Sequence, residues 1–444
     1  METVQSIITL PAELNEDNGR SAETLQKDVM NVDCSSGPSQ GDLGKQTSAG
    51  KPDIVSGEQV EDQMWDPPVE LDPEHLTAEQ IEQVKQMLRE ESASFAKDDS
   101  DVGCAPDLEL DIKLSNPEPV RKTYTSIPPP LYNEVKDYLY DLINRGWVRK
   151  STSSYSSPVV CVRKRDGTLR LCIDYRQLNE RSIKDRRPIP RIQDALNCLK
   201  GNAWFTLLDQ GKAYHQGFVK EECRPYTAFI TPWGLYEWLR IPFGLSGAPG
   251  CFQTFMENTL SDLRDKICIP YLDDVIVFSK SFSGHLQNVR TVLQRLRGSG
   301  IKLKPSKCNF FRPQCRYLGH LVSKEGYSMD SSDKEAVLAL KDKTPTNIGE
   351  LRQLLGFLGF FRKYVADFSR RAKPLYDLMK VDETPPQKGK KKGKKKGVKK
   401  KGQAPSKQPI SWSMEHQACL EDLVNMLTSS EVMAYPDFEQ PFVL

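Results

Sequence analysis

The segment Ile269-Pro270-Tyr271-Leu272-Asp273-Asp274-Val275-Ile276-Val277-Phe278 places two adjacent aspartates between short runs of apolar, β-branched and aromatic residues. Such runs are typical of strands, and the Asp-Asp pair between them predicts the turn of a tight hairpin. Two neighbouring carboxylates repel each other, and a site that offers only oxygen ligands suits a hard cation such as Mg²⁺. On this segment alone, a solvated surface turn remains the alternative, because aspartate is a common turn residue.

A third carboxylate occurs upstream in a similar setting. Trp204-Phe205-Thr206-Leu207-Leu208-Asp209 predicts a buried strand that ends in an acid, and Gln210-Gly211-Lys212-Ala213-Tyr214-His215-Gln216 follows it. Two strand ends that each offer a carboxylate can hold two divalent ions about 4 Å apart. That arrangement activates a hydroxyl and stabilises the leaving oxygens in phosphoryl and nucleotidyl transfer. The pattern therefore favours a metal-dependent site over a surface turn.

Composition limits the class of protein. The 444 residues are enough for two or three domains. The sequence contains no run of about 18 apolar residues and no basic-then-apolar signal at its start. Its eleven cysteines are scattered without a CxxC pair, which is typical of core packing in a reducing compartment. We therefore expect a cytosolic or nuclear protein without a membrane partner.

The overall charge of +2 conceals three blocks of different charge. Residues 1–110 sum to −18, residues 111–380 to +17 and residues 381–444 to +3. A central block this basic indicates a polyanionic partner, and a merely solvated basic face is the alternative. The aspartates described above favour nucleic acid.

Three segments in this order resemble the motifs of a known family. The third is Ile241-Pro242-Phe243-Gly244-Leu245-Ser246-Gly247-Ala248-Pro249-Gly250-Cys251-Phe252-Gln253. Together with the two aspartate segments it is similar to reverse transcriptases of gypsy-type LTR retrotransposons and of retroviral pol polyproteins. The resemblance covers about residues 130–380. It implies an α+β, right-hand polymerase fold with fingers, palm and thumb, in which an antiparallel palm sheet packs on helices.

The resemblance also implies roles for individual residues. Asp209, Asp273 and Asp274 would be catalytic and would hold two Mg²⁺ ions, with Mn²⁺ as an alternative and the Gln210 main-chain carbonyl as a further ligand. Tyr214 would block a ribose 2′-hydroxyl, and Phe243 would line the other side of the nucleotide. The remaining implied contacts are Lys164 and Arg170 to the triphosphate, and Leu318, Gly319 and His320 to the primer. His320 has the alternative of being an ordinary strand histidine.

One departure from the family pattern lies inside the first aspartate segment. Relatives often have Ser-Gly where this chain has Lys212-Ala213. That position is not an implied metal ligand, so it bears on the detail of the nucleotide pocket and not on activity.

Residues 157–174 predict a basic hairpin with an Asp-Gly turn. Alternation within the two strands places Val160, Val162, Leu169, Leu171 and Ile173 on one face, with Arg163, Arg165, Arg170, Cys172 and Asp174 on the other. This parity sets Lys164 on the face opposite Arg170, which makes Arg170 the stronger candidate for the triphosphate. A solvated basic hairpin is the alternative.

The organisation of the chain follows from composition and periodicity. Apolar residues at helical spacing predict helices at 76–88, 131–143, 249–260, 285–296 and 347–364, and another over 412–426. Ten lysines broken by glycines at 388–401 predict a disordered linker that grips phosphate or acts as a nuclear import signal. The predicted parts are a disordered acidic leader (1–64), an extended leader with a short helix (65–130), fingers and palm (131–324), a thumb (325–380), the lysine-rich linker (381–410) and the start of a truncated ribonuclease H-like domain (411–444).

The function expected from these features is template-directed DNA synthesis. Its partners would be an RNA or DNA template with a DNA primer, and deoxynucleoside triphosphates. We expect no ribonuclease H chemistry, because the sequence stops before the residue at which relatives have the first ribonuclease H aspartate. Two alternatives stay open: a domesticated nucleic-acid-binding protein without turnover, and a fragment of a longer polyprotein that carries ribonuclease H elsewhere. The sequence does not indicate an oligomeric state.

Overall fold

The computed structural model describes residues 65–124, 127–163, 167, 169–184, 189–379, 406–429 and 433–435. The predicted acidic leader and the lysine-rich run at 388–401 lie outside these residues. In the described part of the chain, no helix is both long enough and apolar enough to cross a membrane. The same part combines helices with four sheets, which confirms the predicted α+β class.

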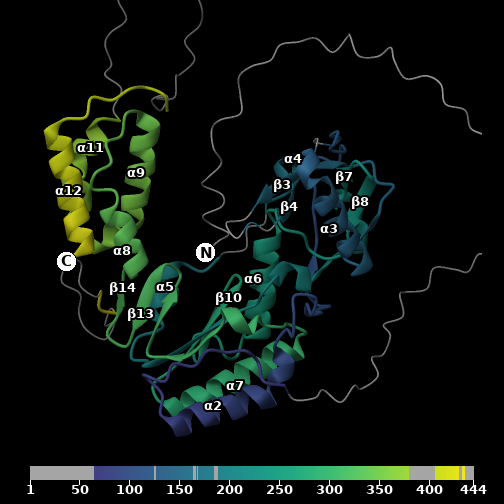
Figure 1. Cartoon of the computed structure of the whole chain (residues 1–444), viewed down its shortest axis with the longest axis horizontal. Coiled ribbons are helices and arrows are strands. Elements are labelled where there is room, and N and C mark those ends of the chain that lie inside the picture. The colour runs from purple at the N-terminus through teal and green to yellow at the C-terminus, as the bar shows by residue number, and fades with distance from the viewer. Residues whose placement is uncertain are drawn as a thin grey trace, which may run out of the picture. The chain divides into compact units, whose positions relative to one another are not determined.

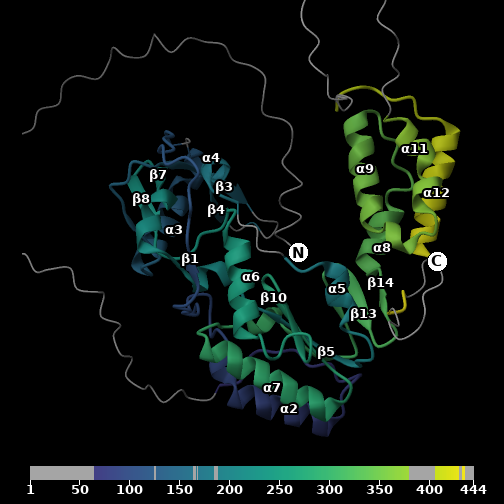
Figure 2. The same ribbon diagram turned by 180° about the vertical axis from the view of Figure 1, so that it is seen from behind.

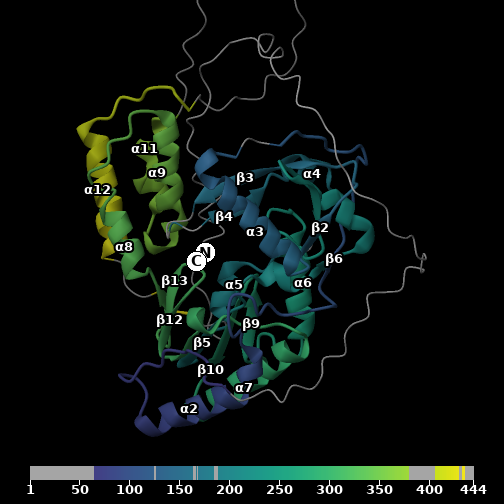
Figure 3. The same cartoon turned by 45° about the vertical axis from the view of Figure 1, so that its right-hand side comes forward.

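A four-stranded antiparallel sheet contains both acid-bearing segments (Figure 3). Its strand order is β11-β5-β10-β9, so β5 and β10 are its central strands. The β-branched and aromatic residues around the aspartates fit the pleated surface of a sheet. The predicted hairpin is confirmed, and the sheet corresponds to the predicted palm. The strands are β5 (Trp204–Asp209), β9 (Cys268–Tyr271), β10 (Asp274–Ser279) and β11 (Asn309–Arg312).

Each face of the palm sheet packs into its own hydrophobic core. Along β10, Val275 and Val277 belong to one buried cluster, whereas Ile276 and Phe278 belong to another. All four side chains are buried. A strand that is covered on both faces needs apolar residues at every position, which explains its continuous apolar sequence. The acids are therefore confined to the end of the strand.

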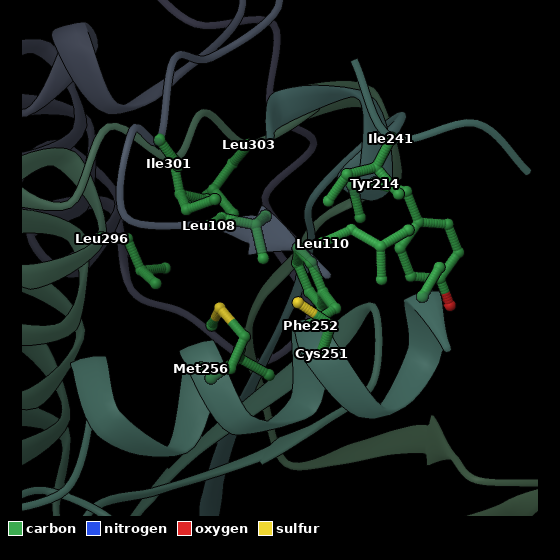
Figure 4. Close-up of a cluster of buried hydrophobic side chains, with 14 of the residues drawn as sticks. Leu108, Leu110, Tyr214, Ile241, Cys251, Phe252, Met256, Leu296, Ile301 and Leu303 are labelled. Carbon is green, nitrogen blue, oxygen red and sulfur yellow. The ribbon is translucent and has the colours of Figure 1, made fainter. Parts of the chain in front are cut away.

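Helices α2, α6 and α7 contribute to the first core. Helix α2 lies along α7 in all three views (Figures 1–3), and α7 packs on β5 and β10. Figure 4 shows Cys251, Phe252 and Met256 of α6 gathered with Leu108 and Leu110. These elements confirm three predicted helices: α2 (Ala78–Glu90), α6 (Ala248–Thr259) and α7 (Phe282–Gly298).

The segment between α2 and the next helix also reaches this core. Strand β1 (Glu109–Leu110) pairs in parallel with β6 (Phe218–Val219). Residues 128–130 were expected to be extended, but a 3₁₀ turn, η2, forms at Pro129–Leu131. Proline holds φ near −65°, a value compatible with the first turn of a helix, so a proline run can begin one. The predicted helix at 131–143 follows as α3 (Tyr132–Asn144).

A five-stranded sheet forms the predicted fingers, with strand order β2-β8-β7-β3-β4. Its strands are β2 (Val148–Lys150), β3 (Ser157–Arg163), β4 (Leu169–Ile173), β7 (Phe229–Thr231) and β8 (Gly234–Trp238). Four short helical segments lie between strands β4 and β7 in the sequence. They are α4 (Arg176–Arg181), α5 (Ile192–Asn197), η3 (Ala213–Gln216) and η4 (Glu221–Thr227).

The β3–β4 hairpin is confirmed, but its predicted faces are wrong. Directly opposed residues of antiparallel strands share a face, and the register sets Val162 opposite Arg170 and Val160 opposite Cys172. Val160 and Val162 therefore lie on the face of Arg170, not with the leucines and Ile173 of β4. Both valines are more than 40% exposed. Alternation relates residues within one strand, whereas the face shared between strands depends on the register of the turn.

A small sheet and a set of helices surround the second core. They include the predicted thumb (325–380), but also two strands from the range predicted as fingers and palm (131–324) and a helix from the range predicted as ribonuclease H-like (411–444). The sheet order is β12-β13-β14, with β12 (Gln314–Tyr317), β13 (His320–Ser323) and β14 (Tyr327–Ser328). The helices are α8 (Ser331–Leu338), α9 (Ile348–Phe360), α10 (Phe368–Arg371), α11 (Lys373–Asp377) and α12 (Met414–Thr428), and the 3₁₀ turn η6 (Arg362–Tyr364) lies between α9 and α10. Two further 3₁₀ turns, η1 (Ser92–Ser94) and η5 (Pro305–Lys307), lie elsewhere in the chain.

Helix α12 shares a core with these thumb helices. It packs against α8, α10 and α11, and Figure 1 shows it beside α11. Its residues Leu420, Leu423, Val424 and Leu427 are fully buried in the cluster that contains the leucines of α9. The predicted helix at 412–426 is thus present, and it belongs to the same hydrophobic core as residues 331–377.

We predict that His285 makes stability depend on pH. It is fully buried on α7, with ring nitrogens 2.8 Å from Thr206 Oγ1 and 3.0 Å from Ser279 Oγ. Burial lowers its pKa from 6.5 to about 3. The unfolded chain therefore gains a proton below pH 6.5 that the folded chain excludes, so the contribution is complete above pH 6.5 and is lost as pH falls towards 3. Between pH 7 and pH 5, the free energy of unfolding therefore falls by about 2 kcal/mol because of His285.

Urea denaturation of wild type and His285→Gln at both pH values tests this. We expect the variant to be less stable at pH 7 and to lose about 2 kcal/mol less than the wild type on acidification. His75→Gln, at a solvent-exposed histidine, is the control and should follow the wild type. An unchanged acid dependence in His285→Gln would contradict the assignment.

We also predict that Leu423→Ala in α12 destabilises the helical core. The side chain is fully buried, so its removal loses apolar burial and leaves a cavity, at a cost of about 2–5 kcal/mol. Met414→Ala, at a position 89% exposed on the same helix, should change stability by less than about 0.5 kcal/mol. Equal effects of the two substitutions, measured by chemical denaturation, would show that α12 does not pack as described.

Candidate active site

Three carboxylates meet at one end of the palm sheet. Asp209 is the last residue of β5 and Asp274 the first of β10, and the antiparallel register sets them directly opposite each other. Opposed residues on one face have Cβ atoms about 4.5–5.5 Å apart. Asp273 lies in the two-residue turn between Tyr271 and Asp274. The structure thus brings together all three aspartates that the sequence singles out as metal ligands.

Burial and mutual repulsion raise the pKa values of two of these aspartates. The pKa of Asp273 rises to about 6, first because of burial and then because of the charges of Asp274 and Asp209. Burial, with the Asp209 charge, also raises the pKa of Asp274. Lys307 offers partial compensation, with Nζ 3.7 Å from Asp209 Oδ2. An acid with a raised pKa is one whose ionised form lacks favourable partners, and a bound cation supplies such a partner.

The donor set fits a hard divalent cation. Asp273 Oδ1 is buried and has no hydrogen-bond partner in the described structure. Asp209 Oδ1 accepts the Gly211 N–H at 2.8 Å, which leaves further lone pairs of this carboxylate for a cation. Among the described residues, the alternative group Asp72, Glu74 and His75 is largely exposed, and Asp72 pairs with Arg312.

The main-chain carbonyl of Gln210, the fourth predicted ligand, follows Asp209 directly. It accepts a hydrogen bond from Gln216 Nε2 at 2.7 Å. A carbonyl oxygen has two lone pairs, so this bond leaves one for a cation. The turn is fixed further by Lys304, whose backbone N–H donates to the Asp209 carbonyl at 2.9 Å.

The two residues predicted to line the nucleotide pocket contact each other. The rings of Tyr214 and Phe243 are 5.5 Å apart in an edge-to-face arrangement, and Tyr214 makes a similar contact with Phe252 at 5.6 Å. Figure 4 shows Tyr214 at one edge of the apolar cluster around Phe252. A hydrogen bond links its hydroxyl to Asp273, and burial together with this charge raises the pKa of Tyr214. The side chain therefore belongs to both the core and the site.

The predicted triphosphate contacts are not described in full. Lys164 lies outside the described residues, and for Arg170 only the backbone is described, opposite Val162. Both roles stay predictions.

The predicted primer hairpin is present between β12 and β13. Leu318 and Gly319 form its two-residue turn with φ of +48° and +80°, as in turns of type I′. His320 is buried, with Nδ1 2.9 Å from the Tyr364 hydroxyl and Nε2 3.1 Å from Lys363 Nζ. These contacts favour a strand histidine that joins the hairpin to η6, and primer contact by His320 stays a prediction.

Both acid-bearing turns contain a strained residue. Leu272, just before Asp273, has a φ of +51°, and Lys212, three residues after Asp209, has a φ of +55°. This region is unfavourable for side chains other than Gly, Asn and Asp, at a cost of about 1–3 kcal/mol each. Lys212, where the chain departs from the family pattern, donates from Nζ to the Asp99 carbonyl at 2.8 Å. The departure is thus accommodated by a contact away from the carboxylates.

Sequence reasoning did not identify the residues that support these turns. Gln216 and Gln253 end two of the quoted motifs, a position that could have drawn attention to them. Lys307 and the segment around Gly103 carry no signal in a single sequence, because their proximity to the site depends on the tertiary fold.

Residues 162–322 match the family described as reverse transcriptase (RNA-dependent DNA polymerase). The chain is 32% identical over 342 residues to the retrovirus-related Pol polyprotein from transposon opus of Drosophila melanogaster. It is 35% identical over 320 residues to the corresponding polyprotein from transposon gypsy of the same species. These matches cover 76% and 70% of this chain but 32% and 29% of the relatives. The chain therefore spans about a third of the length of these relatives.

Solved structures show the same fold. The foamy viral protease-reverse transcriptase in complex with an RNA/DNA hybrid has a TM-score of 0.68 at 22% identity, covering 82% of this chain and 46% of that one. The same protein in complex with dsDNA has a TM-score of 0.68 at 21% identity, and the match covers 85% of this chain and 76% of that one. This likeness confirms the predicted polymerase fold.

We predict that divalent ions stabilise the protein through the three carboxylates. Mg²⁺ or Mn²⁺ should raise the melting temperature of the wild type, because binding to the folded state offsets the repulsion among the acids. Asp273→Asn should raise the melting temperature of the metal-free protein at pH 7 and remove most of the metal-induced increase. Asp262→Asn, at an exposed aspartate of the same region, is the matched control. If metal ions raised the melting temperature of Asp273→Asn as much as that of the wild type, Asp273 would not be a metal ligand.

Proposed function

Residues 162–322 belong to the reverse transcriptase family, and from this premise we propose that the chain catalyses template-directed DNA synthesis. Membership of this family implies dependence on a divalent metal ion. The observation that carries the proposal is the register of β5 and β10, which pairs Asp209 with Asp274 beside Asp273 at one strand end. The relatives are retrotransposon Pol polyproteins, which supports an origin in such an element.

The carboxylates of Asp209, Asp273 and Asp274, with the Gln210 carbonyl, would hold two Mg²⁺ ions, and Mn²⁺ is the alternative. When bound, such ions lower the pKa of a primer 3′-hydroxyl and stabilise the departing pyrophosphate. Asp273 offers a buried oxygen without a partner, and Asp209 offers Oδ2, which lies 3.7 Å from the Lys307 ammonium. These aspartates can therefore exchange weak contacts for metal ligation.

The chain's other residues bind and orient the substrates. The Tyr214 ring, held in place by Phe243 and Phe252, would occupy the space of a ribose 2′-hydroxyl and so favour deoxynucleotides. Lys164 and Arg170 would bind the triphosphate, and the turn at Leu318 and Gly319 would position the primer end. His320 would act through the packing of this hairpin on η6.

The proposed partners are an RNA or DNA template, a DNA primer and deoxynucleoside triphosphates. The charge of +17 over residues 111–380 supports a polyanionic partner. The foamy virus proteins of similar fold are described in complex with an RNA/DNA hybrid and with dsDNA, which supports the same class of ligand. We place this reaction in the cytosol or nucleus, in keeping with the cysteine content.

Primer extension with Mg²⁺ and a labelled primer tests the proposal. We expect wild type to extend primers, and Asp273→Asn to reduce extension by more than about 100-fold, since even partners of metal ligands can cost that much. Affinity for the template-primer duplex should stay within about twofold, because it depends on contacts spread along the phosphate backbone. Asp262→Asn again serves as the control.

Each failure has its own meaning. A wild type that binds the duplex but extends nothing would favour the alternative of a nucleic-acid-binding protein without turnover. A wild-type rate in Asp273→Asn would show instead that synthesis occurs without the proposed metal ligand.

A further inference from the structure

Two buried glutamine side chains contact the backbone of the two acid-bearing turns. Gln216, at the end of η3, is 1% exposed, and Gln253, on α6, is 2% exposed. Neither touches a carboxylate of Asp209, Asp273 or Asp274 in any described contact. Each instead hydrogen-bonds main-chain groups next to one of them.

Gln216 holds the turn that follows Asp209. Its Nε2 donates to the Gln210 carbonyl at 2.7 Å and to the Lys302 carbonyl at 2.9 Å, and its Oε1 accepts from the Lys302 N–H at 2.8 Å. Lys304, two residues further along, donates its N–H to the Asp209 carbonyl. The carboxamide therefore joins the proposed metal-binding turn to the neighbouring chain segment.

Gly103 closes the space around this carboxamide. A Cβ atom at residue 103 would lie 2.2 Å from Gln216 Oε1 and 2.5 Å from the Gly300 carbonyl oxygen. Since real atoms do not approach so closely, only glycine allows the segment to pass here. Gly103 lies well before the region that matches the family, so the support of this turn extends beyond that region.

Gln253 holds the turn that contains Asp273. Its Oε1 accepts the N–H of Leu272 at 2.7 Å, and its Nε2 donates to Glu257 Oε1 at 2.8 Å and to the Pro270 carbonyl at 3.2 Å. Pro270 belongs to β9, and Leu272 is the first residue of the β9–β10 turn. The carboxamide thus anchors the β9 side of this turn to helix α6.

The backbone of both turns contains a residue in an unfavourable conformation, which surrounding contacts must hold in place. Leu272 and Lys212 have φ values of +51° and +55°, which a non-glycine residue keeps only when its surroundings hold it there. Gln253 binds the N–H of Leu272 itself, and Gln216 binds the carbonyl two residues before Lys212. Strained backbone next to reacting groups is a recurring way to fix their geometry.

We propose that Gln216 and Gln253 are positioning residues, each of which fixes one acid-bearing turn so that the carboxylates can hold metal ions together. The proposal rests on the proposed metal-dependent function and deepens it. Groups that orient metal ligands typically change metal affinity or activity about 10- to 100-fold when they are removed. A purely structural role would instead lower stability and leave the metal affinity of the folded protein unchanged.

The test measures Mn²⁺ affinity by electron paramagnetic resonance on the purified full chain. The variants Gln216→Met and Gln253→Met keep the side-chain length and remove the hydrogen bonds. A third variant, Gly103→Ala, introduces a methyl group that clashes with the Gln216 carboxamide. We expect Mn²⁺ affinity about 10- to 100-fold weaker in each, with duplex affinity within twofold of wild type. Mg²⁺ titrations of primer extension should shift to higher concentration by a similar factor.

Two further variants separate positioning from folding. Asn202→Ala removes another buried carboxamide, which binds the carbonyls of Leu199 and Lys200 away from the site. It should lower the melting temperature and keep wild-type Mn²⁺ affinity. The exchange Gln253→Glu with Glu257→Gln keeps an acceptor for the Leu272 N–H and a hydrogen bond to residue 257, so it should retain most of the wild-type affinity.

The outcomes are distinguishable. Folded Gln216→Met and Gln253→Met proteins with wild-type Mn²⁺ affinity would overturn the proposal, even if primer extension were confirmed. A wild type that binds Mn²⁺ but extends no primer would refute the proposed function, while the Mn²⁺ affinities would still decide the positioning role. A wild type without Mn²⁺ binding would overturn both.

Discussion

The repulsion among three carboxylates at one end of the palm sheet is the constraint on which the site depends. Asp209 and Asp274 cannot move apart without breaking the β5–β10 pairing, and Asp273 lies in the turn next to them. The sheet is buried on both faces, so sliding β10 along β5 would carry its apolar residues out of their cores. Hydrophobic packing thus maintains an unfavourable electrostatic arrangement. A bound cation would offset this repulsion, which is the basis of the proposed metal site.

The aromatic residues connect this constraint to the proposed selection of deoxynucleotides. Tyr214 packs on Phe252 in the first core and also hydrogen-bonds Asp273. Its position is therefore set by the same packing that fixes the acids. Under the proposed function, the residue that would face the sugar and the residues that would hold the metal ions therefore share one structural support. The strain at Leu272 and Lys212 is tolerated because that support is rigid.

The features that sequence could predict are those encoded by local pattern. The strands that carry the acids, the hairpin at Asp273 and six of the helices follow from periodicity and turn residues. The faces of the β3–β4 hairpin could not be predicted, because they depend on which residues are paired and not on alternation within a strand. The contacts of Gln216 with Lys302 depend likewise on tertiary approach, since 86 residues separate them.

Residues outside the family match at 162–322 also belong to the packing that supports the site. Gly103 packs against the carboxamide that holds the Gln210 carbonyl, and α2 covers α7 in the core beneath the palm sheet. On the other side, α12 completes the core that also receives Phe278 from β10. Removing either flank would expose buried residues of one of the two cores into which the sheet packs. The segments before and after the matched region therefore act on the site through the two cores, although they supply no carboxylate to it.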